Sequence, residues 1–218
     1  MGAVWGKITA GEIAKALDGD LLQGRPEMRI RGISTDSREI KRGEIFWALK
    51  GERFDGHDFV SKALRKGASG LVIRKGFHGI DAVPTNSQGT WAVIAVEDTL
   101  TALGRLAAWW RRQHRARVVA ITGSVGKTTT KEMTAMILDL SGMTLKNRGN
   151  LNNLIGLPLT LLRLDTGHVN AVLEMGMNRP GEIARLTEIA DPQVGLVTNV
   201  GRAHLEGVGY VERLAYEV

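Results

Sequence analysis

The segment "VVAITGSVGKTTTKEM", which runs from Val118 to Met133, constrains the fold more than any other stretch of the chain. An apolar run of strand length leads through two glycines and a lysine into a threonine-rich start of a helix. A glycine turn between a strand and a helix directs backbone N–H groups toward the positive end of the helix dipole, where phosphate binds. The segment therefore predicts a parallel α/β sheet that carries a phosphate loop.

The loop departs from the general phosphate-loop pattern, because Ile121 stands where that pattern has its first glycine. We predict that Lys127 reaches the β and γ phosphates of a nucleotide and that the Thr128 hydroxyl is a Mg²⁺ ligand. The alternative is an ordinary strand, turn and helix with an exposed lysine. The candidate nucleotide-binding residues are Gly123, Ser124, Val125, Gly126, Lys127, Thr128 and Thr129.

The chain has 218 residues, which is enough for two modest domains. We predict that residues 1–97 form a small α/β domain, which begins with a capping box at Thr9 and Glu12. The box starts a helix that ends at Gly19, and a loop is expected over residues 77–90. The predicted strands are 28–34, 44–49, 70–74 and 91–96, and the second predicted helix is 57–68.

Residues 98–218 are predicted to form a second domain, which begins with a helix capped by Asp98. Apolar strands alternate with helices in this part, which indicates a parallel sheet with helices on both faces. The predicted strands are 118–122, 169–175 and 194–200, and the predicted helices are 128–140, 157–164 and 180–190.

An acidic residue ends one of these apolar strands. Glu174 closes the strand at 169–175, at the end where open α/β sheets bind their ligands, so we predict that it belongs to a magnesium site. Asn199 and His204 follow the next strand and should reach the same edge of the sheet. His204 is either a ligand of a second metal ion or a surface histidine.

Three asparagines, Asn150, Asn152 and Asn153, lie between the phosphate-loop helix and the next apolar helix. Asparagine favours turns, so a capped loop would explain them. They would equally supply donors and acceptors to a polar substrate.

Composition narrows the class of protein. Lysine and arginine outnumber acidic residues by 29 to 23, which suits an anionic ligand. The basic run "RRQHRAR" at 111–117 contains no aromatic residue for base stacking, and we interpret it as a solvated helix end and inter-domain joint, not a nucleic-acid site. No apolar run long enough for membrane insertion and no secretory pattern occur, which predicts a cytoplasmic protein. The absence of cysteine excludes disulfides and thiolate metal sites.

Four segments occur together in order: "ITGSVGKTTTKEM", "GNLNNLIGLPLTLLRL", "LEMGMNRPGEIARL" and "TNVGRAHLEGVG". In order and spacing they resemble the Mur ligases, the ATP-dependent amide ligases of peptidoglycan synthesis. The earlier stretch "ISTDSREIKRGEIFWALKGERFDGHDFV" looks like that family's UDP-sugar-peptide substrate-binding domain. Within the family, the chain is most similar to members that add D-alanyl-D-alanine to UDP-N-acetylmuramoyl-tripeptide.

The resemblance implies that ATP and Mg²⁺ are the cofactors and that residues 98–218 are part of the ATP-binding central domain. We also expect a monomer, although the sequence does not itself reveal the oligomeric state. It implies catalytic roles for Lys127, Glu174 and His204. Thr128 and Glu174 would bind one Mg²⁺, and Glu174 and His204 would take part in a second metal site. The implied substrate residues are Thr35, Asp36, Ser37 and Arg38 for the uridine nucleotide, and Asn150, Asn152 and Asn153 near the γ-phosphate.

The chain also departs from the family pattern. Family members often have aspartate where Leu154 stands and histidine where Arg179 stands. Their metal-bridging lysine is expected where Val218 stands, so it either lies just beyond Val218 or is lacking. Residues 1–218 also do not include the rest of the family's central domain or its carboxyl-terminal domain, which by resemblance help to bind adenine and D-alanyl-D-alanine. We therefore expect that residues 1–218 alone do not carry out ligation. The alternatives are a sister Mur ligase, a folylpolyglutamate synthetase-like ligase, or a non-catalytic module that binds the nucleotide and the UDP-sugar.

Overall fold

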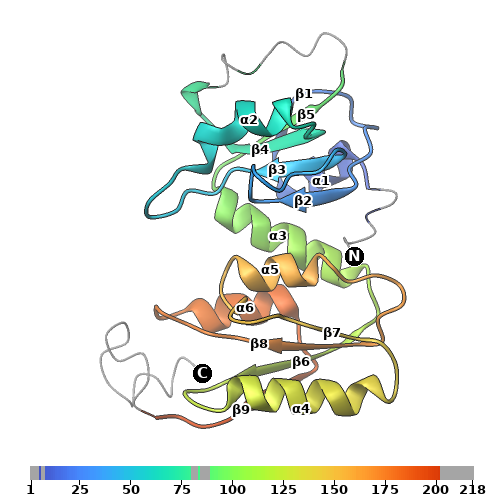
Figure 1. The fold of residues 1–218 in the computed structure, drawn as a ribbon, viewed down its shortest axis with the longest axis vertical. Helices are drawn as coiled ribbons and strands as arrows, with labels where there is room; N and C mark the ends of the chain where they lie inside the picture. The colour runs from blue at the N-terminus through green and yellow to red at the C-terminus, as the bar shows by residue number, and fades with distance from the viewer. Residues whose placement is uncertain (1–4, 6–7, 80–82, 84–88, 202–218) are drawn as a thin grey trace. The chain divides into compact units, whose positions relative to one another are not determined.

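The computed structural model describes residues 5, 8–79, 83 and 89–201. The chain divides into two compact units, residues 1–106 and 107–218, each built around its own sheet (Figure 1). The division falls inside helix α3 (Thr99–Arg112). The predicted boundary lies before this helix, and the assignment of the whole helix to the second domain stays a prediction.

Unit 1 contains a five-stranded sheet in the order β1-β5-β4-β3-β2, in which β2 to β5 are parallel and β1 is an antiparallel edge. β4 and β5 are almost wholly buried, as expected for parallel strands covered on both faces. The strands are β1 (Asp20–Gln23), β2 (Gly32–Ser34), β3 (Glu44–Trp47), β4 (Gly70–Arg74) and β5 (Ala92–Val96).

The helices of unit 1 are α1 (Ala10–Leu17), the 3₁₀ helix η1 (Gly56–Phe59) and α2 (Val60–Arg65). The predicted capping box of α1 is confirmed, because the Thr9 N–H donates to Glu12 Oε2 at 2.8 Å and the Glu12 N–H donates to Thr9 Oγ1 at 3.2 Å. The predicted strand at 28–34 is too long, since only its last three residues pair with β3. Arg29 forms an isolated bridge to Thr9 instead.

Unit 2 contains a four-stranded parallel sheet in the order β7-β8-β6-β9. Helix α4 covers one face and helices α5 and α6 cover the other, so the predicted parallel sheet with helices on both faces is confirmed (Figure 1). The short strand β7 was not predicted. The elements are β6 (Arg117–Thr122), α4 (Lys127–Asp139), β7 (Thr144–Lys146), α5 (Gly156–Leu161), β8 (Asn170–Glu174), α6 (Glu182–Ala190) and β9 (Val194–Val197).

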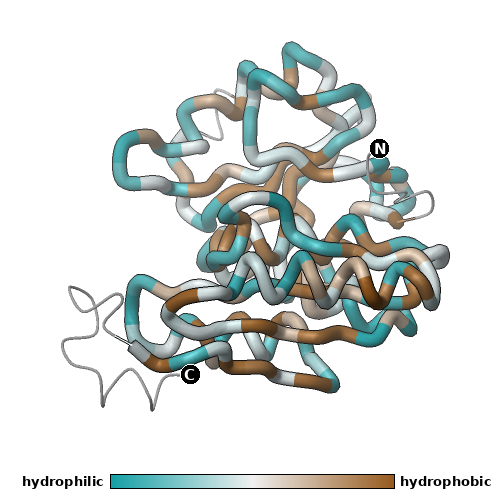
Figure 2. Tube along the Cα trace, turned by 60° about the horizontal axis from the view of Figure 1, so that its bottom comes forward, coloured by the Kyte–Doolittle hydropathy of each residue, from teal (hydrophilic) through white to brown (hydrophobic). Residues whose placement is uncertain are grey.

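Apolar residues recur along the buried strands, while hydrophilic residues colour many of the connecting loops (Figure 2). In β8 every residue from Asn170 to Glu174 is buried. Among the residues that the structure describes, none of the helices combines the length and apolar character needed to cross a membrane.

The basic run at 111–117 is only partly solvated. Arg112, Arg115 and Arg117 are exposed, but Arg111 is 6% exposed. Its guanidinium donates to Ala190 O at 3.1 Å and to His114 O at 2.9 Å. Burial lowers the pKa of Arg111 from its usual value. The interpretation of the whole run as a solvated helix end is therefore wrong for Arg111. Its guanidinium connects the end of α3 to the end of α6 by hydrogen bonds.

Candidate nucleotide site

The turn of the phosphate loop begins two residues later than the general pattern requires. Ile121 is fully buried inside β6 and pairs with Glu174 of β8 and Leu196 of β9. The turn itself starts at Gly123 and ends at Gly126, which have φ of 127° and 87°. Both values lie in the region that favours glycine, so these two residues allow the chain to turn from β6 into α4.

The start of α4 opens into a cavity of about 550 Å³. The N–H groups of the first helical turn have no acceptor within the helix, so they are available to an anion. Lys127 is folded over the loop, where its ammonium donates to Gly123 O at 2.6 Å and Ser124 O at 3.2 Å. The cavity is lined by Ser124, Gly126, Lys127, Thr128, Thr129, Asn150, Asn152, Asn153, Glu174, Gly176, Met177 and Asn178.

The segment that follows β9 holds the outer side of the loop. Asn199 accepts from the Ser124 N–H through its carbonyl, at 3.0 Å, and from the Val125 N–H through its side-chain oxygen, at 2.8 Å. Thr198 donates its hydroxyl to Val125 O at 2.7 Å. The prediction that Asn199 reaches this edge is confirmed, and its contacts shape the loop.

Glu174 lies at the carboxyl end of β8 and is 3% exposed. Its Oε2 accepts from the Thr128 hydroxyl at 2.8 Å, and its Oε1 accepts from the Asn152 amide at 2.8 Å. Carboxylate and hydroxyl oxygens are the ligands that Mg²⁺ prefers, and here they meet beside the phosphate loop. The residues present therefore fit a magnesium nucleotide.

The second predicted metal site is only partly described, because His204 lies outside the described residues. Within residues 5, 8–79, 83 and 89–201, no cluster of three or more histidine, aspartate or glutamate side chains could hold a metal ion. A cation at this site would therefore need oxygen atoms from the phosphates of a nucleotide, or from water, in addition to Thr128 and Glu174.

Two residues that support Glu174 were not predicted from the sequence. Asn147 is fully buried; its amide donates to Glu174 O, and its side-chain oxygen accepts from the Glu174 N–H, both at 2.9 Å. Lys131 is 1% exposed and donates to Asn147 O at 3.0 Å, and its ammonium lies 3.8 Å from Glu174 Oε2. The spacing of Lys131 three residues after Thr128 puts both on one helix face, which is the signal that would have found it.

The Lys131 ammonium also forms an ion pair with a second carboxylate, that of Glu132. Glu132 accepts from Lys131 at 3.1 Å and also forms an ion pair with Lys146 of β7. The hydrogen bond from Lys146, followed by that from Lys131, lowers the pKa of Glu132. A chain of alternating charges thus links β7, α4 and the end of β8.

The three predicted asparagines have different environments. Asn152 contacts Glu174, and Gly176 packs so closely against it that a β-carbon there would lie 2.9 Å from Asn152 Nδ2. Asn153 accepts from the N–H groups of Ile155 and Gly156 at 3.1 and 2.8 Å, so it caps α5, as the turn interpretation predicts. Asn150 is exposed on the wall of the cavity.

The predicted uridine-nucleotide residues form one turn at the carboxyl end of β2, in unit 1. Asp36 accepts from the Arg38 N–H at 2.8 Å and forms an ion pair with the Arg38 guanidinium at 2.7 Å. The hydrogen bond from Arg38 lowers the pKa of Asp36 to about 2. Ser37 is buried, and Thr35 is half-buried. Their contact with a uridine nucleotide stays a prediction.

Comparison with known proteins identifies both parts of the chain. Residues 29–111 match the catalytic domain of the Mur ligase family, and residues 121–217 match the Mur ligase middle domain. The UDP-N-acetylmuramoyl-tripeptide–D-alanyl-D-alanine ligase of Escherichia coli K12 is 45% identical over 208 residues, which are 95% of this chain and 43% of the relative. The same ligase of Bacillus subtilis 168 is 41% identical over 96% of this chain and 44% of the relative.

Solved structures give the same result. MurF from Acinetobacter baumannii matches with a TM-score of 0.85 and 39% identity, over 96% of this chain and 44% of that chain. The MurF ligase of Thermotoga maritima, solved in complex with ADP, matches with a TM-score of 0.75 and 39% identity, over 87% of this chain and 42% of that chain. The chain therefore spans less than half the length of the relatives it matches.

Proposed function

Because the chain belongs to the Mur ligase family, we propose that it forms the substrate-binding and nucleotide-binding part of an ATP-dependent amide ligase. This ligase adds D-alanyl-D-alanine to UDP-N-acetylmuramoyl-tripeptide in the cytoplasm, a step of peptidoglycan synthesis on which the cell wall, cell shape and division depend. The proposal is carried by one observation: Thr128 at the start of α4 meets Glu174 at the end of β8, beside the phosphate loop, at 2.8 Å.

The proposed reaction has two steps. The terminal carboxylate of the peptide attacks the γ-phosphorus of ATP, the bond to the β-phosphate oxygen breaks, and an acyl phosphate and ADP form. The amino group of D-alanyl-D-alanine then attacks the acyl carbon, loses a proton and expels phosphate, which leaves an amide. Both reactants of the first step are anions, so preorganised positive charge is the main requirement.

Each residue of the site has a role that follows from its position. The N–H groups at the start of α4 and the Lys127 ammonium bind the β and γ phosphates, for which Lys127 leaves the loop carbonyls that it contacts here. Asn152 and Lys131 orient Glu174. When bound, Mg²⁺ would be held by Thr128 and Glu174 and would neutralise charge on the phosphates. His204 completes the proposed catalytic set.

The proposed partners are small molecules. We expect a monomer that neither binds nucleic acid nor inserts into a membrane. The burial of Arg111 supports the expectation that the protein does not bind nucleic acid, because one of the four arginines of the basic run is unavailable to a polyanion.

Calorimetry with two UDP-muramoyl peptides tests the substrate. We expect UDP-N-acetylmuramoyl-tripeptide to bind more tightly than the corresponding dipeptide. Tighter binding of the dipeptide would indicate a sister ligase and contradict the proposal.

The metal assignment is tested with ADP binding measured over a range of Mg²⁺ concentrations. Thr128→Val removes the hydroxyl that faces Glu174, so we expect Mg²⁺ to enhance ADP binding about ten-fold less than in the original protein. Thr130→Val is the matched control, since Thr130 lies on the same helix but does not line the cavity. Equal magnesium dependence of the two variants would remove Thr128 from the proposed site.

A further inference from the structure

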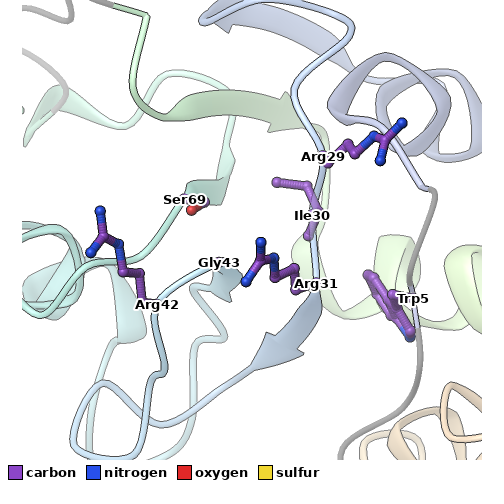
Figure 3. Close-up of a pocket in the computed structure, with 7 residues that line it drawn as sticks. All are labelled: Trp5, Arg29, Ile30, Arg31, Arg42, Gly43 and Ser69. Carbon is purple, nitrogen blue, oxygen red and sulfur yellow. The ribbon is translucent and has the colours of Figure 1, made fainter.

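Unit 1 contains a cavity that neither the predicted substrate residues nor the nucleotide site accounts for. Its volume is about 720 Å³, and it lies where β2, β3 and β4 begin. Arg31, Gly43 and Ser69, which line it, each stand immediately before one of these parallel strands. The cavity is therefore at the opposite edge of the sheet from residues 35–38, which follow β2. Figure 3 shows the residues that line it.

The lining is positively charged. Arg29, Arg31 and Arg42 line the cavity, and none of its described lining residues is acidic. Within the described part of the chain, none of these three arginines has a carboxylate within ion-pair distance, and all three are exposed. The neighbouring Glu44 uses its carboxylate to accept from the Lys41 N–H at 2.8 Å. The cavity thus holds positive charge that the described residues do not neutralise.

Two glycine turns place the polar groups. Gly43 has φ of 95°, and a β-carbon there would lie 2.8 Å from Arg31 Cδ, so the Arg31 stem lies directly on this turn. Gly67 has φ of 96° and faces the Arg42 stem, and the chain then continues to Ser69, whose N–H donates to Glu44 O at 2.8 Å. The two turns and the hydrogen bond from Ser69 to Glu44 thus place these backbone segments beside the cavity. Groups that are positioned before binding reduce its entropic cost.

Figure 3 shows the Ser69 hydroxyl facing the same space as the side chains of Arg31 and Arg42. A guanidinium offers paired N–H donors that match the oxygen atoms of a phosphate, and a hydroxyl adds a further donor. We propose that this cavity binds a small molecule that carries a phosphate or diphosphate group. It is a second anion site in the protein, on a different unit from the phosphate loop.

The test follows the backbone amide signal of Ser69 by NMR during titration of the ¹⁵N-labelled protein with inorganic pyrophosphate at constant ionic strength. The phosphate loop is expected to bind pyrophosphate as well. Because Ser69 lines the cavity in unit 1, its amide signal reports binding there and not binding at the phosphate loop. We expect a saturable shift, and Arg31→Gln combined with Arg42→Gln should weaken the affinity about ten-fold or more. The control combines Arg65→Gln with Arg74→Gln, two exposed arginines of the same unit outside the cavity, and should leave the affinity unchanged within about two-fold.

A shift that does not saturate, or an equal loss of affinity in both double variants, would overturn the proposal. Sodium malonate, a dianion without phosphorus, is expected to bind about ten-fold more weakly than pyrophosphate. Equal affinity for malonate would overturn the assignment to phosphate. A titration with ADP distinguishes the two sources of a diphosphate group. If ADP shifts the Ser69 signal with a higher affinity than pyrophosphate, the ligand is a nucleotide. If its affinity is lower, the ligand is the free anion.

Discussion

Lys131 is the residue whose removal should disturb the nucleotide site most. It is 1% exposed and stands between Glu132 and Glu174, so its charge compensates a buried carboxylate. Removal of one partner of a buried ion pair leaves an uncompensated charge in a medium of low polarity.

Lys131→Met is therefore expected to lower the free energy of unfolding by about 3 kcal/mol. Lys146→Met is the control, because Lys146 pairs with Glu132 at the half-exposed end of the same chain of charges, and its loss should cost about 1 kcal/mol or less. Urea denaturation at neutral pH measures both. Similar losses in the two variants would mean that the buried position of Lys131 does not matter.

Asp36 provides a prediction about pH. Its pKa is lowered to about 2, first by the side-chain hydrogen bond from Arg38, so Arg38→Met should raise it toward the ordinary value of 3.8. The pKa of Asp36 is lower in the folded state than in the unfolded state. The pair therefore stabilises the fold fully at a pH above the ordinary pKa of 3.8, and this stabilisation is lost as the pH falls through about 2. NMR titration of the Asp36 carboxyl carbon checks the shift. The Lys62 ammonium also lowers the pKa of Asp36, but only by a weaker electrostatic attraction, so Lys62→Met should change the pKa less than Arg38→Met. A larger change in the Lys62 variant would contradict this order of causes.

At the scale of elements, the phosphate loop depends on two glycines that differ in their surroundings. A β-carbon on Gly123 would lie 2.3 Å from the Thr198 hydroxyl oxygen, whereas a β-carbon on Gly126 would have nothing within 4 Å. Both residues have positive φ, so both substitutions strain the backbone, but only the first also pushes the loop away from the segment after β9.

Gly126→Ala should thus lower the free energy of unfolding by about 1 kcal/mol through backbone strain alone. Gly123→Ala should cost about 2 kcal/mol or more and also weaken ADP binding about ten-fold, since the steric overlap displaces Thr198 and Asn199. Thermal unfolding and ADP calorimetry on the two variants measure the difference. Equal ADP affinities would show that the contact with Thr198 does not set the shape of the loop.

At the scale of the whole molecule, residues 1–218 span less than half of the relatives that they match. A polypeptide of residues 1–218 is expected to bind ADP, because the loop, Thr128 and Glu174 all lie within its described part. It is expected to form no amide from ATP, UDP-N-acetylmuramoyl-tripeptide and D-alanyl-D-alanine. A coupled assay for ADP release with product chromatography checks this, and any amide product would contradict the prediction.

Much of the fold was predictable because the signals are local. The capping box at Thr9 and Glu12, the apolar strands β4 and β8, and the loop before α4 each depend on residues that are close in sequence. The errors have local causes as well. β1 (DLLQ) and β7 (TLK) contain only two apolar residues and one, so no apolar run marks them as strands. The strand predicted at 28–34 was too long because Arg29 bridges to Thr9 and only the last three residues pair with β3.

The sequence by itself determined that a phosphate loop follows β6 and that an acidic residue ends β8, because turn chemistry and apolar periodicity are properties of short segments. Only the tertiary structure decided what Glu174 contacts. Its partners Thr128 and Asn152 are 46 and 22 residues away in sequence, and the order β7-β8-β6-β9 brings them to one edge. The cavity at Arg31 and Arg42 likewise exists because β2 and β3 start side by side, a pairing that no local pattern specifies.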